Sequence, residues 1–151
     1  MFWNGHGDDN IVTGHKNEPL VIANKNDYLL KNKIVYAISC RSAKNLGREA
    51  VEKGALSYTG YDDDFIFCYE SNKTTKPLED NTAKLFLEPS LLFIKSLLKN
   101  NTVEESLNRA KDEMKNNLKK AYSEEDSSSS RFLWWNLKHM ISHGNQSSKL
   151  S

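Results

Sequence analysis

Two residues of this sequence have side chains that could act together in nucleophilic catalysis: the thiol of Cys40 and the imidazole of His6. A cysteine attacks as its thiolate, and a histidine within reach can accept the proton near neutral pH. Gly5 and Gly7 flank the histidine, so the backbone can turn sharply there and offer an unobstructed N–H to an oxyanion. The pattern predicts cysteine-dependent acyl transfer. The alternative is a small buried cysteine and a loop histidine without a shared role.

The elements that must position these two residues are strands. Lys33–Ser39 is a continuous run of β-branched and aromatic residues, typical of a central strand buried on both faces. Met1–Asn4 resembles the end of another strand. If the two strands are parallel neighbours, His6 and Cys40 emerge at the same carboxyl edge of the sheet, where ligands and catalytic groups collect. A helix predicted over 42–53 would direct its positive end at the sulfur and favour the thiolate.

The remaining pattern predicts a mixed α/β chain with a helical C-terminal half. After the predicted helix, Gly54 is a natural stop, and two further strand-like runs follow, which makes a βαβ unit with parallel strands. The expected elements beyond the helix are strands at Ala55–Gly60 and Phe65–Tyr69, helices starting at Pro89 and Thr102, a flexible linker over Glu124–Ser130, and a last helix over Arg131–His143.

A cluster of acidic residues forms a second candidate site. Asp62, Asp63 and Asp64 follow a predicted strand and could face the same edge as Cys40, together with Asp8 and Asp9. Such carboxylates could select a basic side chain of a substrate or bind a hard cation such as calcium, although the spacing of an EF-hand is absent. Asp62 is the residue we assign to substrate binding. The alternative is a solvated turn.

Metal and cofactor motifs are absent from the sequence. His139 and His143 are four residues apart, which puts them on one face of the predicted helix, but no glutamate of an HExxH motif lies between them. We expect a surface pair there and predict no metal site. Neither a GxxxxGK[ST] loop nor a GxGxxG motif occurs, so we predict no nucleotide and no other cofactor.

Composition limits the function classes. The 151 residues contain 21 Lys and Arg against 20 Asp and Glu, for a formal net charge of +1. This balance argues against a nucleic-acid binder, and no apolar run approaches the roughly 20 residues of a membrane span. The N-terminus has no signal-peptide pattern. Two cysteines do not make a disulfide scaffold, so we expect a cytoplasmic protein.

The order of these features resembles a known family over roughly residues 2–70. A strand leads to His-Gly, a buried strand ends in Ser39-Cys40, and Gly54-Ala55 and Gly60-Tyr61 follow. This arrangement is similar to the caspase-like fold of cysteine peptidases, and most similar to its CHAT-domain and gingipain-like branches. The resemblance implies an α/β three-layer sandwich with a mostly parallel sheet. It also implies a cysteine-type endopeptidase, a hydrolase that acts on peptide or protein substrates.

By this resemblance, His6 is the catalytic histidine and Cys40 the nucleophile, and the backbone N–H groups of Gly7 and Cys40 form the oxyanion hole. The family core has strands upstream of the histidine strand, and this chain has no residues for them. We therefore expect a partial domain over 1–145 and a disordered tail over 146–151.

The uncovered first strand could then pair with a partner chain or a second copy. The alternative function is a catalytically inactive CHAT-like remnant that acts as a protein–protein interaction module. Its docking surfaces would be the sheet edge near Met1 and the helix with Trp134 and Trp135.

Overall fold

Strand β5 (Ile34–Ile38) is the inner strand around which the main sheet is built, and all five of its residues are buried. A strand buried on both faces was expected from the run of apolar residues at this position, and that expectation is confirmed. β1 (Phe2–Asn4) and β6 (Ser57–Tyr61) pair with it in parallel on either side. Strand β7 (Met140–Gly144) pairs antiparallel with β6, so the order is β1-β5-β6-β7.

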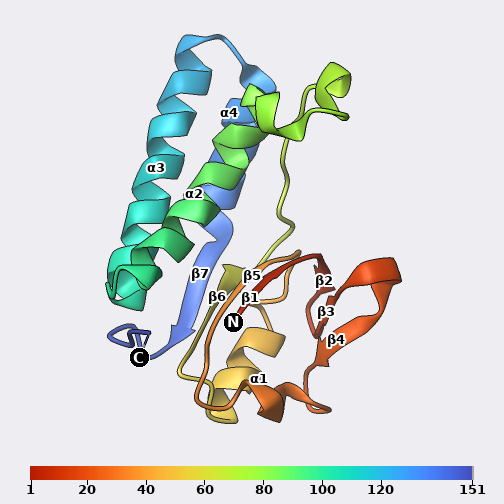
Figure 1. The fold of residues 1–151 in the computed structure, drawn as a ribbon, viewed down its shortest axis with the longest axis vertical. Helices are drawn as coiled ribbons and strands as arrows, with labels where there is room; N and C mark the ends of the chain where they lie inside the picture. Colours follow the sequence, from red (N-terminus) through yellow and green to blue (C-terminus); the bar gives the residue numbers. More distant parts are fainter. Residues whose placement is uncertain (151) are drawn as a thin grey trace. The chain divides into compact units, whose positions relative to one another are not determined.

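The computed structural model describes residues 1–150, which form two compact units. The first unit comprises Met1–Phe65, Thr102–Glu104 and the segment from His139 onward, and it contains the main sheet. The second comprises Ile66–Asn101 and Glu105–Lys138, and it is helical. Figure 1 follows the chain through both units.

The crossover between β5 and β6 contains helix α1 (Leu46–Glu52), which packs against β6 and β7. The predicted βαβ unit is therefore confirmed. The helix is shorter than the predicted range 42–53, because residues 41–45 form turns before it and the Leu46 N–H bonds to the Asp9 carbonyl. Gly54 ends the crossover with a φ of +99°, a conformation that suits glycine.

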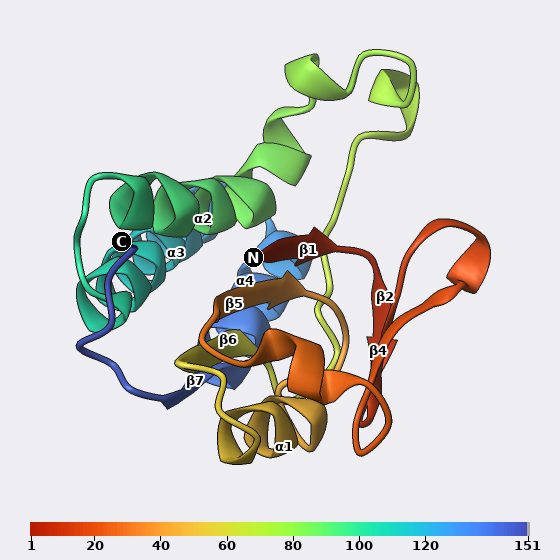
Figure 2. The same cartoon turned by 60° about the horizontal axis from the view of Figure 1, so that its bottom comes forward.

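A small antiparallel sheet follows β1 directly and was not predicted. Its strands, in the order β2-β3-β4, are β2 (His6–Asp8), β3 (Ile11–Thr13) and β4 (Pro19–Ile22). Figure 2 shows the chain passing from β1 into this sheet within the first unit. Val12 and Val21 are its buried residues, and they join the same apolar core as Val35 of β5. A 3-10 turn, η2 (Asp27–Leu30), then leads into β5.

The helical unit contains α2 (Asn81–Leu98), α3 (Val103–Ser123) and most of α4 (Ser127–His139), after the 3-10 turns η3 (Ser71–Lys73) and η4 (Pro77–Glu79). The predicted start of the second helix at Pro89 is wrong. α2 starts eight residues earlier, at Asn81, because the Asp80 carboxylate caps it by accepting from the Ala83 N–H at 2.7 Å.

Three further expectations about local structure differ from the structure. Phe65–Tyr69 forms no strand, since the Asn136 side chain hydrogen-bonds both the N–H and the carbonyl of Ile66. The predicted linker contains the first residues of α4, because the Asp126 carboxylate accepts from the Ser129 N–H. The predicted last helix ends at His139, and the chain continues as β7.

Part of the segment 146–151, predicted as a disordered tail, makes backbone hydrogen bonds, and residue 151 lies outside the described residues. The carbonyls of Gln146 and Ser148 accept from the N–H groups of Glu104 and Val103, each at 3.0 Å. Ser148 is buried. Among residues 1–150, no helix is both long and apolar enough to span a membrane.

Candidate functional site

The pairing of β1 with β5 brings the two predicted catalytic residues to one edge of the main sheet. Asn4 is paired with Ile38, and the Gly5 N–H extends the pairing by donating to the Ile38 carbonyl at 3.1 Å. His6 lies two residues after Asn4, and Cys40 lies two residues after Ile38. The expectation that both emerge beyond neighbouring parallel strands is met by the topology.

Gly7 lies directly against the backbone of the cysteine. A Cβ atom at this position would come within 2.8 Å of the Cys40 carbonyl oxygen and 2.9 Å of the Ser39 Cβ. Both distances are too short for any side chain, so a close approach of β2 to the end of β5 requires glycine here. The residue assigned to the oxyanion hole is therefore packed on the turn that contains the assigned nucleophile.

The Cys40 thiol is half-buried and faces the segment that follows β6. Its sulfur lies 3.9 Å from the carbonyl oxygen of Phe65. Burial raises the pKa of the thiol and is the largest cause; a backbone hydrogen bond with Phe65 and the Arg41 guanidinium lower the pKa, but together with the Asp64 carboxylate, which raises it, the net shift is upward. The expected thiolate stabilisation by the helix is absent because α1 begins six residues further on, at Leu46. The thiol is thus protonated at neutral pH.

His6 is the first residue of β2, and its side chain is exposed. Its carbonyl accepts a hydrogen bond from the Thr13 hydroxyl at 3.4 Å, which ties it to β3. Within residues 1–150, the structure has no hydrogen bond between the imidazole and the Cys40 thiol. A dyad would therefore need the exposed imidazole to turn toward the sulfur.

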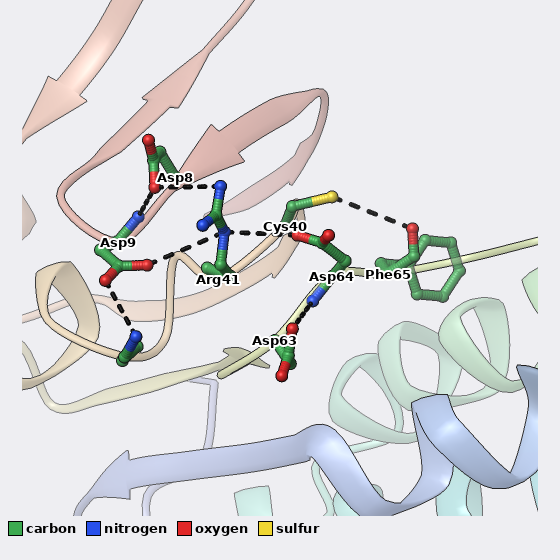
Figure 3. A network of polar contacts seen from close by, with 8 residues as sticks. Asp8, Asp9, Cys40, Arg41, Asp63, Asp64 and Phe65 are labelled. Carbon is green, nitrogen blue, oxygen red and sulfur yellow. Dashed lines mark hydrogen bonds and ion pairs between the residues drawn. The ribbon is translucent and has the colours of Figure 1, made fainter.

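An ion-pair network surrounds the residue after the cysteine (Figure 3). The Arg41 guanidinium lies 3.3 Å from the Asp8 carboxylate, 3.3 Å from Asp64 and 3.8 Å from Asp9. Lys44 adds a contact of 3.0 Å to Asp9. Three of the five aspartates predicted to share one edge, Asp8, Asp9 and Asp64, therefore converge on a single arginine beside Cys40.

Asp62, the residue assigned to substrate binding, does not join the Arg41 network and contacts His139 instead. Its carboxylate lies 2.8 Å from Nδ1 of His139, and its N–H donates to the His139 carbonyl. His143 lies on β7, and its Nε2 is 2.7 Å from the Ala43 carbonyl. The two histidines therefore do not share a helix face. In the described part of the chain, no group of three or more His, Cys, Asp or Glu residues could hold a metal ion.

Sequence reasoning missed Arg41 as the centre of the acidic cluster. The sequence signal was an arginine directly after the cysteine, which lies in the chain between Asp8-Asp9 and Asp62-Asp63-Asp64. It also missed the Phe65 carbonyl next to the sulfur, since a main-chain group has no sequence signature.

The helical unit contains a cavity of about 620 Å³ between the end of α3 and the start of α4. Its aromatic lining residues, Tyr122 and Trp134, have exposed fractions of 72% and 52%. Trp134 belongs to the helix that was predicted to form either core or an interface. None of the residues assigned to catalysis lines this cavity.

Comparison with known proteins yields no match for this chain among family models, curated proteins or solved structures. The class of protein therefore rests on the site geometry and on the sequence resemblance.

Proposed function

We propose that this chain is a cytoplasmic caspase-like cysteine peptidase domain, with Cys40 as the nucleophile and His6 as the proton-transfer residue. One observation supports this above others: the parallel register of β1 and β5 leaves both residues two positions beyond the Asn4 and Ile38 pair. Two functional side chains after adjacent parallel strands are the arrangement expected of an α/β active site.

The raised pKa of Cys40 determines what His6 must do. Because the thiol is protonated at rest, its proton has to move to the imidazole as the sulfur attacks the carbonyl carbon of the peptide. The carbonyl becomes an oxyanion, for which the N–H groups of Gly7 and Cys40 are the proposed donors. The imidazolium then returns the proton to the departing amine, which leaves a thioester on Cys40.

Water completes the reaction. It adds to the thioester carbonyl, gives a proton to His6, and the thiol leaves with that proton as the carboxylic acid forms. No metal or cofactor enters these steps. Asp62 remains a proposed substrate-binding residue only if a substrate competes for its contact with His139.

A second candidate function, a non-catalytic interaction module, is favoured by specific observations. The Cys40 thiol is half-buried with a raised pKa, and His6 has no hydrogen bond to it within residues 1–150. The docking surfaces proposed from the sequence are the edge strand β1 and helix α4, where Trp134 lines the cavity. A peptidase needs the Cys40 thiol for hydrolysis, whereas an interaction module does not.

The test is hydrolysis of a mixed peptide library by the full chain, followed by mass spectrometry of the products. For the peptidase we expect Cys40→Ala to lower turnover at least about a thousandfold, since the nucleophile is removed. The matched control, Cys68→Ala, changes the other free cysteine and should retain turnover. An absence of products with the native protein, or equal turnover by Cys40→Ala, would support the module.

A further inference from the structure

We propose that Arg41 is a positioning residue for Cys40: its guanidinium, held by Asp8 and Asp64, fixes the turn that presents the thiol. The inference rests on the proposed function, but it can be tested separately from peptide hydrolysis. It assigns a role to the ion-pair network that the proposed catalytic steps leave unused.

The backbone of Arg41 gives the first argument. Its φ is +55°, in the left-handed region that is unfavourable for a residue with a Cβ. Such a conformation persists where neighbouring contacts determine it. Here the Arg41 N–H donates to the Asp63 carbonyl at 3.1 Å, and the Arg41 carbonyl accepts from the Lys44 N–H at 2.9 Å. Both backbone polar groups of Arg41 are therefore hydrogen-bonded, which fixes the turn directly after Cys40.

The side chain gives the second argument. Its ion-pair partners lie on two segments: Asp8 on β2 and Asp9 just after it, and Asp64 after β6. The arginine thereby connects the cysteine turn to β2, which contains His6, and to the segment whose Phe65 carbonyl faces the sulfur. With 42% of the side chain exposed, each ion pair alone contributes little to stability. Their common effect is on the position of the turn.

Charge gives the third argument. The charged groups that act on the thiol are Arg41 on its own turn and Asp64 after β6. Asp8 and Asp9, on the β2 side, pair with the same guanidinium (Figure 3). Asp64 disfavours the thiolate and Arg41 favours it. Loss of the guanidinium would remove the positive charge that opposes Asp64 at the sulfur, so the arginine also affects how readily Cys40 ionises.

The experiment measures the rate of iodoacetamide alkylation at Cys40 against pH, by mass spectrometry, in a Cys68→Ser background. Arg41→Gly suits the positive φ and removes only the side chain, so we expect the folded variant to shift the pH midpoint upward by about one unit. Arg41→Lys keeps the charge and should lie near the wild type. Asp64→Asn should shift the midpoint downward. Arg41→Gly combined with Asp64→Asn should bring it back toward the wild type.

The outcomes separate this proposal from the proposed function. A stability effect alone would lower the melting temperature of Arg41→Gly without moving the Cys40 midpoint in the folded protein, and that result overturns the proposal. If Arg41→Gly does not fold, an unchanged midpoint in Asp64→Asn overturns it instead. Shifted midpoints without any peptide hydrolysis by the wild type would support the role of Arg41 and reject the peptidase.

Discussion

Gly7 lies directly against the backbone of Cys40, although Gly7 belongs to the small antiparallel sheet and Cys40 is in the turn after β5 of the main sheet. The contact closes the small antiparallel sheet onto the carboxyl end of β5. Because His6 precedes Gly7, the same contact determines where the backbone of His6, and with it the attached imidazole, lies relative to the thiol.

Gly7→Ala should therefore damage the site more than its small volume suggests. The added methyl would lie 2.8 Å from the Cys40 carbonyl oxygen, so β2 must move away, at a cost of about 1–3 kcal/mol in the free energy of unfolding. Urea denaturation measures this loss. Gly14→Ala is the matched control, since the atoms nearest to its methyl would belong to the flexible Leu20 side chain, at 3.3 Å. Equal stability of the two variants would contradict the close packing.

In the helical unit, Pro89 makes Asn117 important for stability. Proline has no N–H, so the carbonyl of Leu85, four residues earlier in α2, lacks its helical donor. The buried Asn117 side chain from α3 donates to that carbonyl at 2.8 Å. We expect Asn117→Ala to lower the free energy of unfolding by about 1–3 kcal/mol, because a buried acceptor loses its donor.

A double-mutant cycle tests the cause. In a Pro89→Ala background, the new N–H can bond to Leu85, so Asn117→Ala should cost about 1 kcal/mol less than in the wild type. Asn116→Ala, at the neighbouring exposed position, should have little effect in either background. Additive effects of the Pro89 and Asn117 substitutions would show that the amide does not replace the missing helical donor.

The main sheet was predictable where its sequence signal is local. The apolar run of β5 and the stop at Gly54 need no information from elsewhere in the chain. β7 was not predictable in the same way, since the apolar spacing of Met140 and Ile141 also fits a helix that continues from Arg131. The strand forms because β6 offers a free edge, some 80 residues earlier in the sequence.

The candidate site also has features that local sequence predicts and features that depend on distant segments. Placing His6 and Cys40 at one edge required only that two strands be parallel neighbours. The protonation state of the thiol could not be predicted, because two groups that act on it, the Asp64 carboxylate and the Phe65 backbone, come from the segment after β6. The left-handed Arg41 was equally hidden, since nothing local to the residue marks a positive φ.

Stability toward acid should depend on Asp27, whose side chain is 1% exposed and pairs with the Lys53 ammonium at 2.9 Å. Burial alone would raise its pKa, but the Asn24 N–H and Lys53 outweigh burial and hold the pKa below its ordinary value. A carboxyl with a lowered folded-state pKa stabilises the fold above its unfolded-state pKa, and this contribution is lost as the pH falls through the folded-state pKa.

We therefore expect the wild type to lose stability below about pH 4 more steeply than Asp27→Asn does. Urea denaturation at several pH values between about 7 and 3 measures this difference. Asp112→Asn, which removes an exposed ion pair with Lys115, should follow the wild type. Parallel curves for the wild type and Asp27→Asn would show that Asp27 is not the source of acid sensitivity.

The most direct measurement of a His6 and Cys40 dyad is covalent labelling of the native protein with a pool of peptidyl acyloxymethyl ketones, which need an active cysteine. We expect one adduct, located at Cys40 by peptide mass spectrometry, that is lost in His6→Ala and retained in the matched control His15→Ala. No adduct on the native protein, or equal labelling of Cys40 and Cys68 only after denaturation, would contradict a peptidase site in this chain.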